Sequence, residues 1–280
     1  MQSLAFYDSL GSQLRRDIVR MVHAVQSGHP GGSLGCVEYF MLLYNDILNY
    51  RLPFNMNADG EDVFILSNGH ISPVWYSTLA RAGFFDIKEL ATFRKLNSRL
   101  QGHPATAEHI PGVRFASGSL GQGLSNAIGV ALTKKLKKET NLVYSLHGDG
   151  ELQEGQIWEA AMFAAHNKVD NLIITIDYNG KQIDGPVDDI LSLGNIIQKW
   201  EAFGWKVFSV DGNNIEALNL CLLNAKNATK KGVPICIVMT TIMGKGVDFM
   251  EDNHKWHGSP PNDDQLKVAL GQLKESLGDY

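Results

Sequence analysis

The chain contains 280 residues, of which 44% are hydrophobic and 20% are charged, and its formal net charge is −5. Such a length suits one large α/β domain, and the mild acidity argues against nucleic acid, because phosphate backbones are bound by dense Lys/Arg surfaces. No segment reaches the roughly 18 consecutive apolar residues of a membrane helix, and the N-terminus lacks the pattern of a signal peptide. The three cysteines form no paired framework, which favours a reducing compartment. We therefore expect a cytoplasmic protein that binds neither nucleic acid nor membrane.

Apolar residues at spacings of three and four predict an amphipathic helix over residues 8–25. It ends at the run Ser27-Gly28-His29-Pro30-Gly31-Gly32, which breaks helices. The same pattern predicts further helices over residues 34–48, 72–82, 87–94 and 121–138. The last of these continues into the basic run 134–138, which we interpret as a solvated helix end.

Five apolar runs predict buried strands, at residues 62–66, 142–146, 172–177, 206–210 and 235–241. Because they alternate with helical segments, we predict an α/β fold with a mainly parallel sheet of five or six strands and helices on both faces. Ligands of such sheets bind beyond the carboxyl ends of the strands. Unusual motifs follow four of the runs there: SNGH, HGDGE, DYNGKQIDG and GKG. No repeat or linker divides the chain, so residues 1–280 are expected to form a single domain.

The sharpest chemical signal is the turn Gly148-Asp149-Gly150-Glu151 followed, thirty residues after Asp149, by Asn179. The glycines permit a tight turn that brings main-chain amides close to an anion, and the helix that begins near Gln153 directs its positive end at the same place. Asp149 offers a carboxylate oxygen, Asn179 an amide oxygen and Lys181 its main-chain carbonyl. Few protein oxygens together with phosphate oxygens form a typical Mg²⁺ site, and Ca²⁺ or Mn²⁺ would accept the same ligands.

Seven motifs extend this pattern over the chain: GHPGGSLG (28–35), LSNGH (66–70), FRKLNSRLQGHP (93–104), GSLGQGLSNAIG (118–129), GDGELQEGQIWEAA (148–161), IDYNGKQIDG (176–185) and GKGVDFMEDNHKWHG (244–258). In this order and at these separations they resemble the N-terminal part of transketolase across essentially the whole chain. The resemblance implies the thiamine-diphosphate-binding fold and thiamine diphosphate as cofactor. It also implies a divalent metal ion, Mg²⁺ or alternatively Ca²⁺ or Mn²⁺, held by Asp149, Asn179 and the Lys181 carbonyl.

The resemblance assigns further residues to the cofactor. His70, the Gly150 amide and His257 would face the diphosphate. Gly118 and Leu120 would meet the aminopyrimidine side, and Ile183 would pack on the thiazolium ring. The predicted cofactor-binding set is completed by two residues of the metal motif, Glu151 and Asn179.

Catalytic roles are also implied by the resemblance. The histidines His29, His70, His103 and His257 would surround the reactive carbon, bind the hydroxyls of the donor and assist proton transfers, work that suits imidazole near neutral pH. Glu154 would be a buried carboxylate that joins two active sites through a subunit interface. The other histidines His23, His109 and His166 are interpreted as helix-surface or structural residues.

Two positions depart from the family pattern. His147 stands before the GDG turn, where an apolar residue is usual, and Met243 replaces the basic residue common before GKG. Both are expected near the cofactor side, so an unusual donor or acceptor is an open alternative. His254 and His257 have a spacing compatible with zinc but lack a second ligand pair, and the run 121–123 is only half a dinucleotide fingerprint.

The resemblance further implies a partner. In transketolase, the glutamate that activates the cofactor and the residues that grip the sugar phosphate belong to pyrimidine-binding and C-terminal domains, which do not occur in residues 1–280. We therefore expect a partner chain that carries these domains, an α₂β₂ assembly, and no turnover by this chain alone.

The expected reaction is that of transketolase in the pentose phosphate pathway, the transfer of a two-carbon ketol unit from a ketose phosphate to an aldose phosphate. The alternatives are a split transketolase-like carboligase of specialised metabolism, a relative of deoxyxylulose-phosphate synthase, and a non-catalytic cofactor-binding subunit. Donor and acceptor stay open, since the phosphate-gripping residues are expected on the partner.

Overall fold

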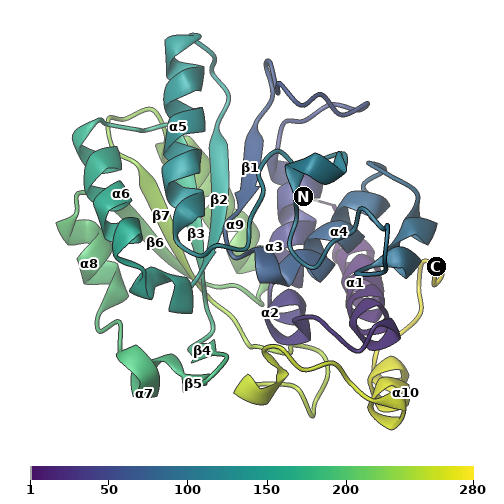
Figure 1. Ribbon diagram of the computed structural model, residues 1–280. Coiled ribbons are helices and arrows are strands. Elements are labelled where there is room, and N and C mark those ends of the chain that lie inside the picture. The colour runs from purple at the N-terminus through teal and green to yellow at the C-terminus, as the bar shows by residue number, and fades with distance from the viewer. Residues whose placement is uncertain (1) are drawn as a thin grey trace.

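A sheet of five parallel strands forms the centre of the molecule (Figure 1). The computed structural model describes residues 2–280. The strands are β1 (Val63–Leu66), β2 (Val143–Gly148), β3 (Leu172–Tyr178), β6 (Lys206–Asp211) and β7 (Ile235–Thr240), hydrogen-bonded in the order β1-β2-β3-β7-β6. The predicted α/β fold and its parallel sheet are confirmed, and each predicted strand ends within two residues of an observed one.

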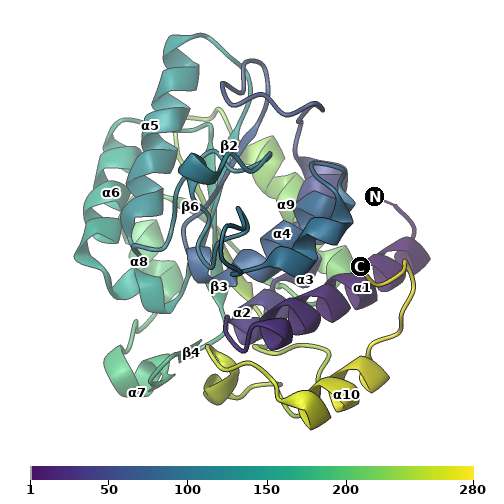
Figure 2. The same ribbon diagram turned by 45° about the vertical axis from the view of Figure 1, so that its right-hand side comes forward.

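Helices cover both faces of this sheet (Figures 1 and 2). One face carries α1 (Leu4–Ala24), α2 (Pro30–Gly35), α3 (Val37–Leu42), α4 (Ser72–Arg81) and α9 (Ile215–Ala228). The other face carries α5 (Gln122–Leu136), α6 (Gly155–His166) and α8 (Ile196–Ala202). No helix within residues 2–280 combines the length and the apolar character needed to cross a lipid bilayer.

The remaining elements are short. They are α7 (Val187–Leu191), α10 (Asp263–Gln272), the hairpin of β4 (Lys181–Gln182) and β5 (Gly185–Pro186), a π-helical turn Leu43–Ile47, and the 3₁₀ segments Gly69–Ile71, Ile87–Thr92, Thr106–Glu108, Gly150–Gln153 and His254–Trp256. Many of them, including the hairpin, stand at the carboxyl edge of the sheet.

Side chains of each strand alternate between two buried cores. Along β2, Val143 belongs to the core beneath α5 and α6, whereas Tyr144 and Leu146 belong to the core beneath α1 to α4 and α9. Strands buried on both faces need apolar residues at nearly every position, which is why they read as continuous apolar runs. The result is a platform whose carboxyl edge carries the predicted motifs.

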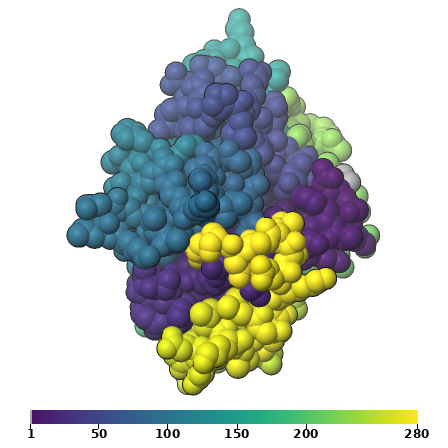
Figure 3. Space-filling view, turned by 90° about the vertical axis from the view of Figure 1, so that its right-hand side faces the viewer, coloured from purple at the N-terminus to yellow at the C-terminus, as the bar shows by residue number. Residues whose placement is uncertain are grey.

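The C-terminal segment lies across α1, as Figure 3 shows in yellow over purple. Arg16 of α1 donates hydrogen bonds to the main-chain oxygens of Leu270 and Leu273, at 3.0 and 2.7 Å, and to the Asp279 carboxylate at 2.7 Å. These contacts fasten the last residues of the chain to its first helix.

Two helix predictions need correction. Residues 34–48 do not form one helix, because α2 and α3 are separated at Cys36 and are followed by the π-helical turn. Moreover, α2 begins at Pro30, inside the run expected to end helices, since proline is favoured in a first helical turn. Residues 87–92 form a 3₁₀ helix where an α-helix over 87–94 was predicted.

Candidate active site

Loops at the carboxyl ends of β1, β2, β3 and β7 enclose a cavity of about 360 Å³. Every residue predicted for the site lines it: His29, His70, His103, Gly118, Leu120, Asp149, Gly150, Glu151, Glu154, Asn179, Lys181, Ile183 and His257. These residues span most of the chain, and the parallel sheet brings them to one edge. The structure therefore gathers the whole predicted set, while the role of each residue stays a prediction.

Several lining residues were not predicted: Gly32, Asn68, Gly148, Gln153, Asp177 and Gln182. Met243, noted as a departure from the family, lines the cavity as well. Asn68 and Asp177 are polar residues at the carboxyl ends of apolar runs, and that position was the signal available in the sequence. Gln182 belongs to the β4–β5 hairpin, whose residues carry no strand pattern.

The site histidines form one cluster. The ring centroid of His29 lies 5.1 Å from that of His70, 6.3 Å from that of His103 and 5.7 Å from that of His257. Burial, reinforced by His257, lowers the pKa of His29 to about 4, and burial also lowers the pKa of the other three. The imidazoles are therefore neutral at pH 7, and each can both donate and accept a hydrogen bond.

Two of these rings have a buried nitrogen that lacks a hydrogen-bond partner within residues 2–280, namely Nδ1 of His29 and Nδ1 of His257. Buried polar atoms in native proteins almost always have a partner. A polar ligand in the cavity would supply one.

Close packing fixes the wall beside His103. Gly118 has a φ of +133°, and a Cβ there would lie 3.1 Å from the His103 ring. Only glycine combines that conformation with this approach. The main chain of the 118–120 segment is thereby presented to the cavity.

The predicted metal ligands meet where β2 and β3 end. Asp149 accepts hydrogen bonds from the Gly150 N–H at 2.8 Å and from the Gly180 N–H at 2.6 Å. Asn179 Oδ1 accepts from the Lys181 N–H at 2.9 Å, and Asn179 Nδ2 donates to the Asp177 carboxylate at 2.9 Å. Asp149 and Asp177 are both only 2% exposed.

These two carboxylates have no counter-ion in the described part of the chain, since no Lys, Arg or His there forms an ion pair with either. Burial and then the neighbouring Asp177 raise the pKa of Asp149 to about 7, and burial raises the pKa of Asp177. Buried negative charge of this kind requires compensation, so a divalent cation fits the site.

The donor set restricts the kind of metal site. Within residues 2–280, no cluster of three or more His, Cys, Asp or Glu side chains is arranged to hold a metal ion. A cation at Asp149 would therefore depend on amide and main-chain oxygens and on oxygens of a ligand, which is the pattern that Mg²⁺ prefers.

Glu151 accepts hydrogen bonds from three separate segments of the chain beside the cavity. Its Oε1 accepts from the Gly121 N–H at 2.8 Å and from the Ser67 hydroxyl, and its Oε2 accepts from the Gly148 N–H at 3.1 Å. Burial opposes ionisation, yet His147 and these donors hold the pKa of Glu151 below its ordinary value. The oxygens of Glu151 thus bind the chain itself, and its predicted contact with a cofactor remains a prediction.

His147 differs from the expectation that it lies at the cofactor side. It is 1% exposed and does not line the cavity. Strand alternation directs it to the same face of β2 as Val143, where its Nε2 lies 2.7 Å from Ser145 Oγ and its Nδ1 lies 3.5 Å from Glu151. Its neighbour Glu151 lines the cavity and lies between His147 and the site.

Glu154 lies at the rim of the cavity and is exposed on this chain. The burial predicted for its carboxylate therefore requires a second chain to cover it. Ile183 stands near the same rim and is 59% exposed.

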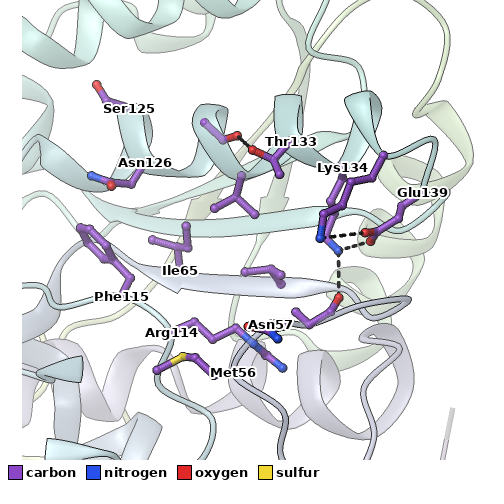
Figure 4. A pocket seen from close by; sticks show the side chains of 15 residues that line it. Met56, Asn57, Ile65, Arg114, Phe115, Ser125, Asn126, Thr133, Lys134 and Glu139 are labelled. Carbon is purple, nitrogen blue, oxygen red and sulfur yellow. Dashed lines mark hydrogen bonds and ion pairs between the residues drawn. The ribbon is translucent and has the colours of Figure 1, made fainter. Parts of the chain in front are cut away.

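A second cavity, of about 440 Å³, lies between β1 and α5 (Figure 4). Ile65 lines it, and no predicted site residue does. At its edge Lys134 is 4% exposed, donates to the Ala58 carbonyl at 3.2 Å and pairs with Glu139 at 2.7 Å. The interpretation of residues 134–138 as a solvated helix end is therefore wrong for Lys134, because these two groups enclose its ammonium.

Comparison with known sequences identifies relatives of similar length. The family model described as transketolase, thiamine diphosphate binding domain, matches residues 9–278. The 6-deoxy-6-sulfo-D-fructose transketolase subunit SqwG of Clostridium sp. (strain MSTE9) is 39% identical, over 89% of this chain and 89% of that protein. One of the subunits of the apulose-4-phosphate transketolase of Phocaeicola vulgatus is 35% identical, over 94% of this chain and 92% of that protein.

Solved structures agree with this relationship. Transketolase from Campylobacter jejuni superimposes with a TM-score of 0.89 at 32% identity, over 97% of this chain. The chain spans only 43% of the length of that transketolase. Transketolase from Leishmania mexicana gives a TM-score of 0.88 at 29% identity, with 42% of its length covered.

The fold, the loops at its carboxyl edge and these relatives lead to one conclusion. This chain belongs to the transketolase family, as the thiamine-diphosphate-binding part of a transferase.

Proposed function

We propose that this chain is the diphosphate-binding subunit of a two-chain transketolase, which transfers a two-carbon ketol unit from a ketose phosphate to an aldose phosphate. The observation that carries the proposal is the cavity itself. It combines two buried carboxylates, for which residues 2–280 supply no cationic partner, with a cluster of neutral histidines, on the fold of the family.

In this proposal the GDG turn would hold the diphosphate end of the cofactor. Asp149, Asn179 and the Lys181 carbonyl hold a divalent metal ion, for which Mg²⁺ is the first choice. The Gly150 main chain and the neutral His70 and His257 face the phosphate oxygens. Thiamine diphosphate, when bound, supplies the electron sink for breaking and forming the carbon–carbon bond.

In this proposal the histidines bind the sugar substrate and transfer protons to and from its hydroxyl groups. A neutral imidazole has one acceptor nitrogen and one N–H donor, so it can accept a proton from a donor hydroxyl and return it. The Nδ1 atoms of His29 and His257, which have no hydrogen-bond partner in the described part of the chain, can bind a polar ligand. We assign His29, His70, His103 and His257 to hydroxyl binding and proton transfer.

A second polypeptide completes the active site in this proposal. It carries the pyrimidine-binding and C-terminal domains and forms an α₂β₂ assembly with this chain. Exposed apolar side chains at the cavity and beside it support a covering chain: Ile183 lines the cavity and is 59% exposed, and Leu191, whose carbonyl accepts a hydrogen bond from the lining residue Gln153, is 57% exposed. The exposed Glu154 carboxylate at the rim of the cavity fits a position between subunits.

The sugar specificity has a second candidate. Two relatives of similar length are named for unusual substrates, a sulfosugar and apulose-4-phosphate. Met243 lines the cavity where the family commonly has a basic residue. A carboligase of specialised metabolism with such a donor is therefore the alternative within the same reaction class.

The test is turnover with thiamine diphosphate and Mg²⁺, using this chain with and without a candidate partner chain that carries the pyrimidine-binding domain. We expect activity only in the mixture, with xylulose-5-phosphate and ribose-5-phosphate. Turnover only with 6-deoxy-6-sulfo-D-fructose or apulose-4-phosphate would select the alternative. Activity of the isolated chain would contradict the two-chain proposal.

A further inference from the structure

Asp177 is a buried residue of the cavity wall that binds the side chain of the predicted metal ligand Asn179. It stands near the end of β3, two residues before Asn179, and is 2% exposed. Its Oδ2 accepts a hydrogen bond from Asn179 Nδ2 at 2.9 Å, and its Oδ1 accepts one from the Thr241 hydroxyl. The Cys36 thiol forms a further contact with it.

These contacts determine which end of the Asn179 amide faces which neighbour. Both Asp177 oxygens act as acceptors, Oδ1 from the Thr241 hydroxyl and Oδ2 from Asn179, so the amide turns its Nδ2 toward Asp177. The main-chain N–H of Lys181 only donates, and it binds Asn179 Oδ1 at 2.9 Å. The amide is therefore held from both ends in one of its two orientations, and Oδ1 keeps a second lone pair.

No Lys, Arg or His within residues 2–280 forms an ion pair with Asp177, and the neighbouring Asp149 is equally buried. A buried carboxylate without a cation costs stability. Asparagine at this position would fill the same volume without that cost.

We propose that Asp177 is a positioning residue, which holds the Asn179 amide so that its oxygen, and not its nitrogen, is offered to the divalent cation. This inference rests on the proposed function, because it assumes a cation between Asp149 and Asn179. Partners of this kind, which bind a metal ligand and not the metal, commonly change metal affinity by about 10–100-fold when they are replaced.

The experiment measures the Mg²⁺ dissociation constant of the full chain by calorimetric titration at saturating thiamine diphosphate, and the thermal midpoint without Mg²⁺. Asp177→Ala should weaken Mg²⁺ binding by about 10–100-fold. Asp177→Asn should weaken it less, because its amide oxygen can still accept from Asn179. Asp177→Asn should keep the wild-type thermal midpoint without Mg²⁺, whereas Asp177→Ala should lower it, because the Thr241 hydroxyl and the Asn179 amide lose their acceptor.

An exchange of the two side chains tests orientation directly. Asn179→Asp places two acceptor-only carboxylates side by side and should weaken Mg²⁺ binding. The double variant Asp177→Asn/Asn179→Asp restores a donor–acceptor pair with the same charge and volume as wild type. It should bind Mg²⁺ within about threefold of wild type, because the oxygen again faces the Lys181 N–H and the cation.

Asp62→Asn provides the matched control. Asp62 is also buried, at 4% exposure, but it accepts from the Asn49 and Leu142 N–H groups at the opposite edge of the sheet. Its replacement should lower the thermal midpoint and leave Mg²⁺ affinity unchanged.

Two results would overturn the positioning role. One is wild-type Mg²⁺ affinity in a folded Asp177→Ala variant, and the other is a double variant that binds no better than Asn179→Asp. Absence of Mg²⁺-dependent cofactor binding in the wild-type chain would instead contradict the proposed function, and the positioning role with it.

Discussion

Two clusters of buried charge in this molecule differ in whether their charges are paired. Where α1 meets α4 and the C-terminal segment, Asp17 pairs with Arg81 at 2.6 Å and Arg16 pairs with Asp279 at 2.7 Å. The Asp17 and Arg81 side chains are 0% and 5% exposed, so the pair is fully enclosed. This cluster is complete within the chain.

At the carboxyl edge of the sheet the corresponding partners are missing from the residues that the structure describes. Hydrogen bonds from Arg16 lower the pKa of Asp279 to about 2, whereas burial raises the pKa of Asp149 to about 7. The same kind of side chain is thus stabilised as an anion in one region and destabilised as an anion in the other. The difference indicates that the first cluster fastens the fold, whereas the second is completed by a ligand.

The largest expected effect is that of Asp149→Ala. Removing the carboxylate removes the principal metal ligand, so Mg²⁺-dependent binding of thiamine diphosphate should become undetectable by calorimetric titration. The thermal midpoint without metal should change little, because losing a buried carboxyl offsets the lost acceptor of the Gly150 and Gly180 N–H groups. Unchanged cofactor affinity would contradict the assignment of Asp149 as a ligand.

Replacing His29 should have the next largest effect. His29→Gln removes a neutral proton carrier from the cluster, so kcat of the assembled enzyme should fall by roughly 10²–10⁴-fold with the cofactor still bound. His23→Gln is the matched control, because His23 pairs with Asp263 on the surface, outside the cavity. Equal losses in the two variants would exclude a specific role for His29.

A change in the paired cluster of α1 and α4 should lower stability and leave cofactor affinity unchanged. Arg81→Met leaves the Asp17 carboxylate buried without its cation, which should cost about 3–5 kcal/mol in the free energy of unfolding, measured by denaturant titration. Cofactor affinity of the folded variant should match wild type. A loss of affinity larger than the loss of stability would show that the two clusters are coupled.

A change of pH should alter the contribution of Asp149 to stability without a mutation. The pKa of Asp149 is raised from 3.8 to about 7, so its folded form keeps a proton that the unfolded chain releases. Its contribution to metal-free stability is therefore present below about pH 4 and is lost as pH rises through 7.

Metal binding depends on the same proton. A divalent cation must displace it, so Mg²⁺ affinity should fall by up to about tenfold for each pH unit below 7. The shift in thermal midpoint caused by Mg²⁺ and thiamine diphosphate should consequently be larger at pH 8 than at pH 5.5. A shift that is the same at both values would count against a protonated Asp149.

The smallest effect is expected from Met243→Lys. An added cation in the cavity should increase thiamine diphosphate affinity by roughly two- to fivefold, the range of weak ion pairs. Ile242→Lys adds the same charge next to the cavity without lining it, and should leave the affinity unchanged. Reduced affinity in Met243→Lys would mean that the burial of the lysine outweighs its attraction for the diphosphate.

The sequence predicted the sheet and the residues of the cavity well for a physical reason. Parallel strands buried on both faces produce unbroken apolar runs, and their carboxyl ends must converge, so the motifs at Asn68, Asp149 and Asn179 were bound to meet. Their roles came from the resemblance to transketolase and not from periodicity.

Features that depend on contacts between distant segments were missed. The burial of Lys134 depends on Ala58, which lies far from it in the sequence. The direction of His147 followed from the register of β2, and the role of Asp177 appears only once Thr241 and Asn179 are seen around its carboxylate. Local patterns contain no information on such pairings.

The central claim is that the buried carboxylates at the carboxyl edge of the sheet, Asp149 and Asp177, belong to a metal–diphosphate site. An anomalous diffraction map tests this claim most directly. Crystals of the chain grown with thiamine diphosphate and Mn²⁺ should show one strong anomalous peak, within coordination distance of Asp149, Asn179 and the Lys181 carbonyl, and bridged to the diphosphate. A bound diphosphate without a peak at these residues, or a peak elsewhere in the chain, would contradict the account.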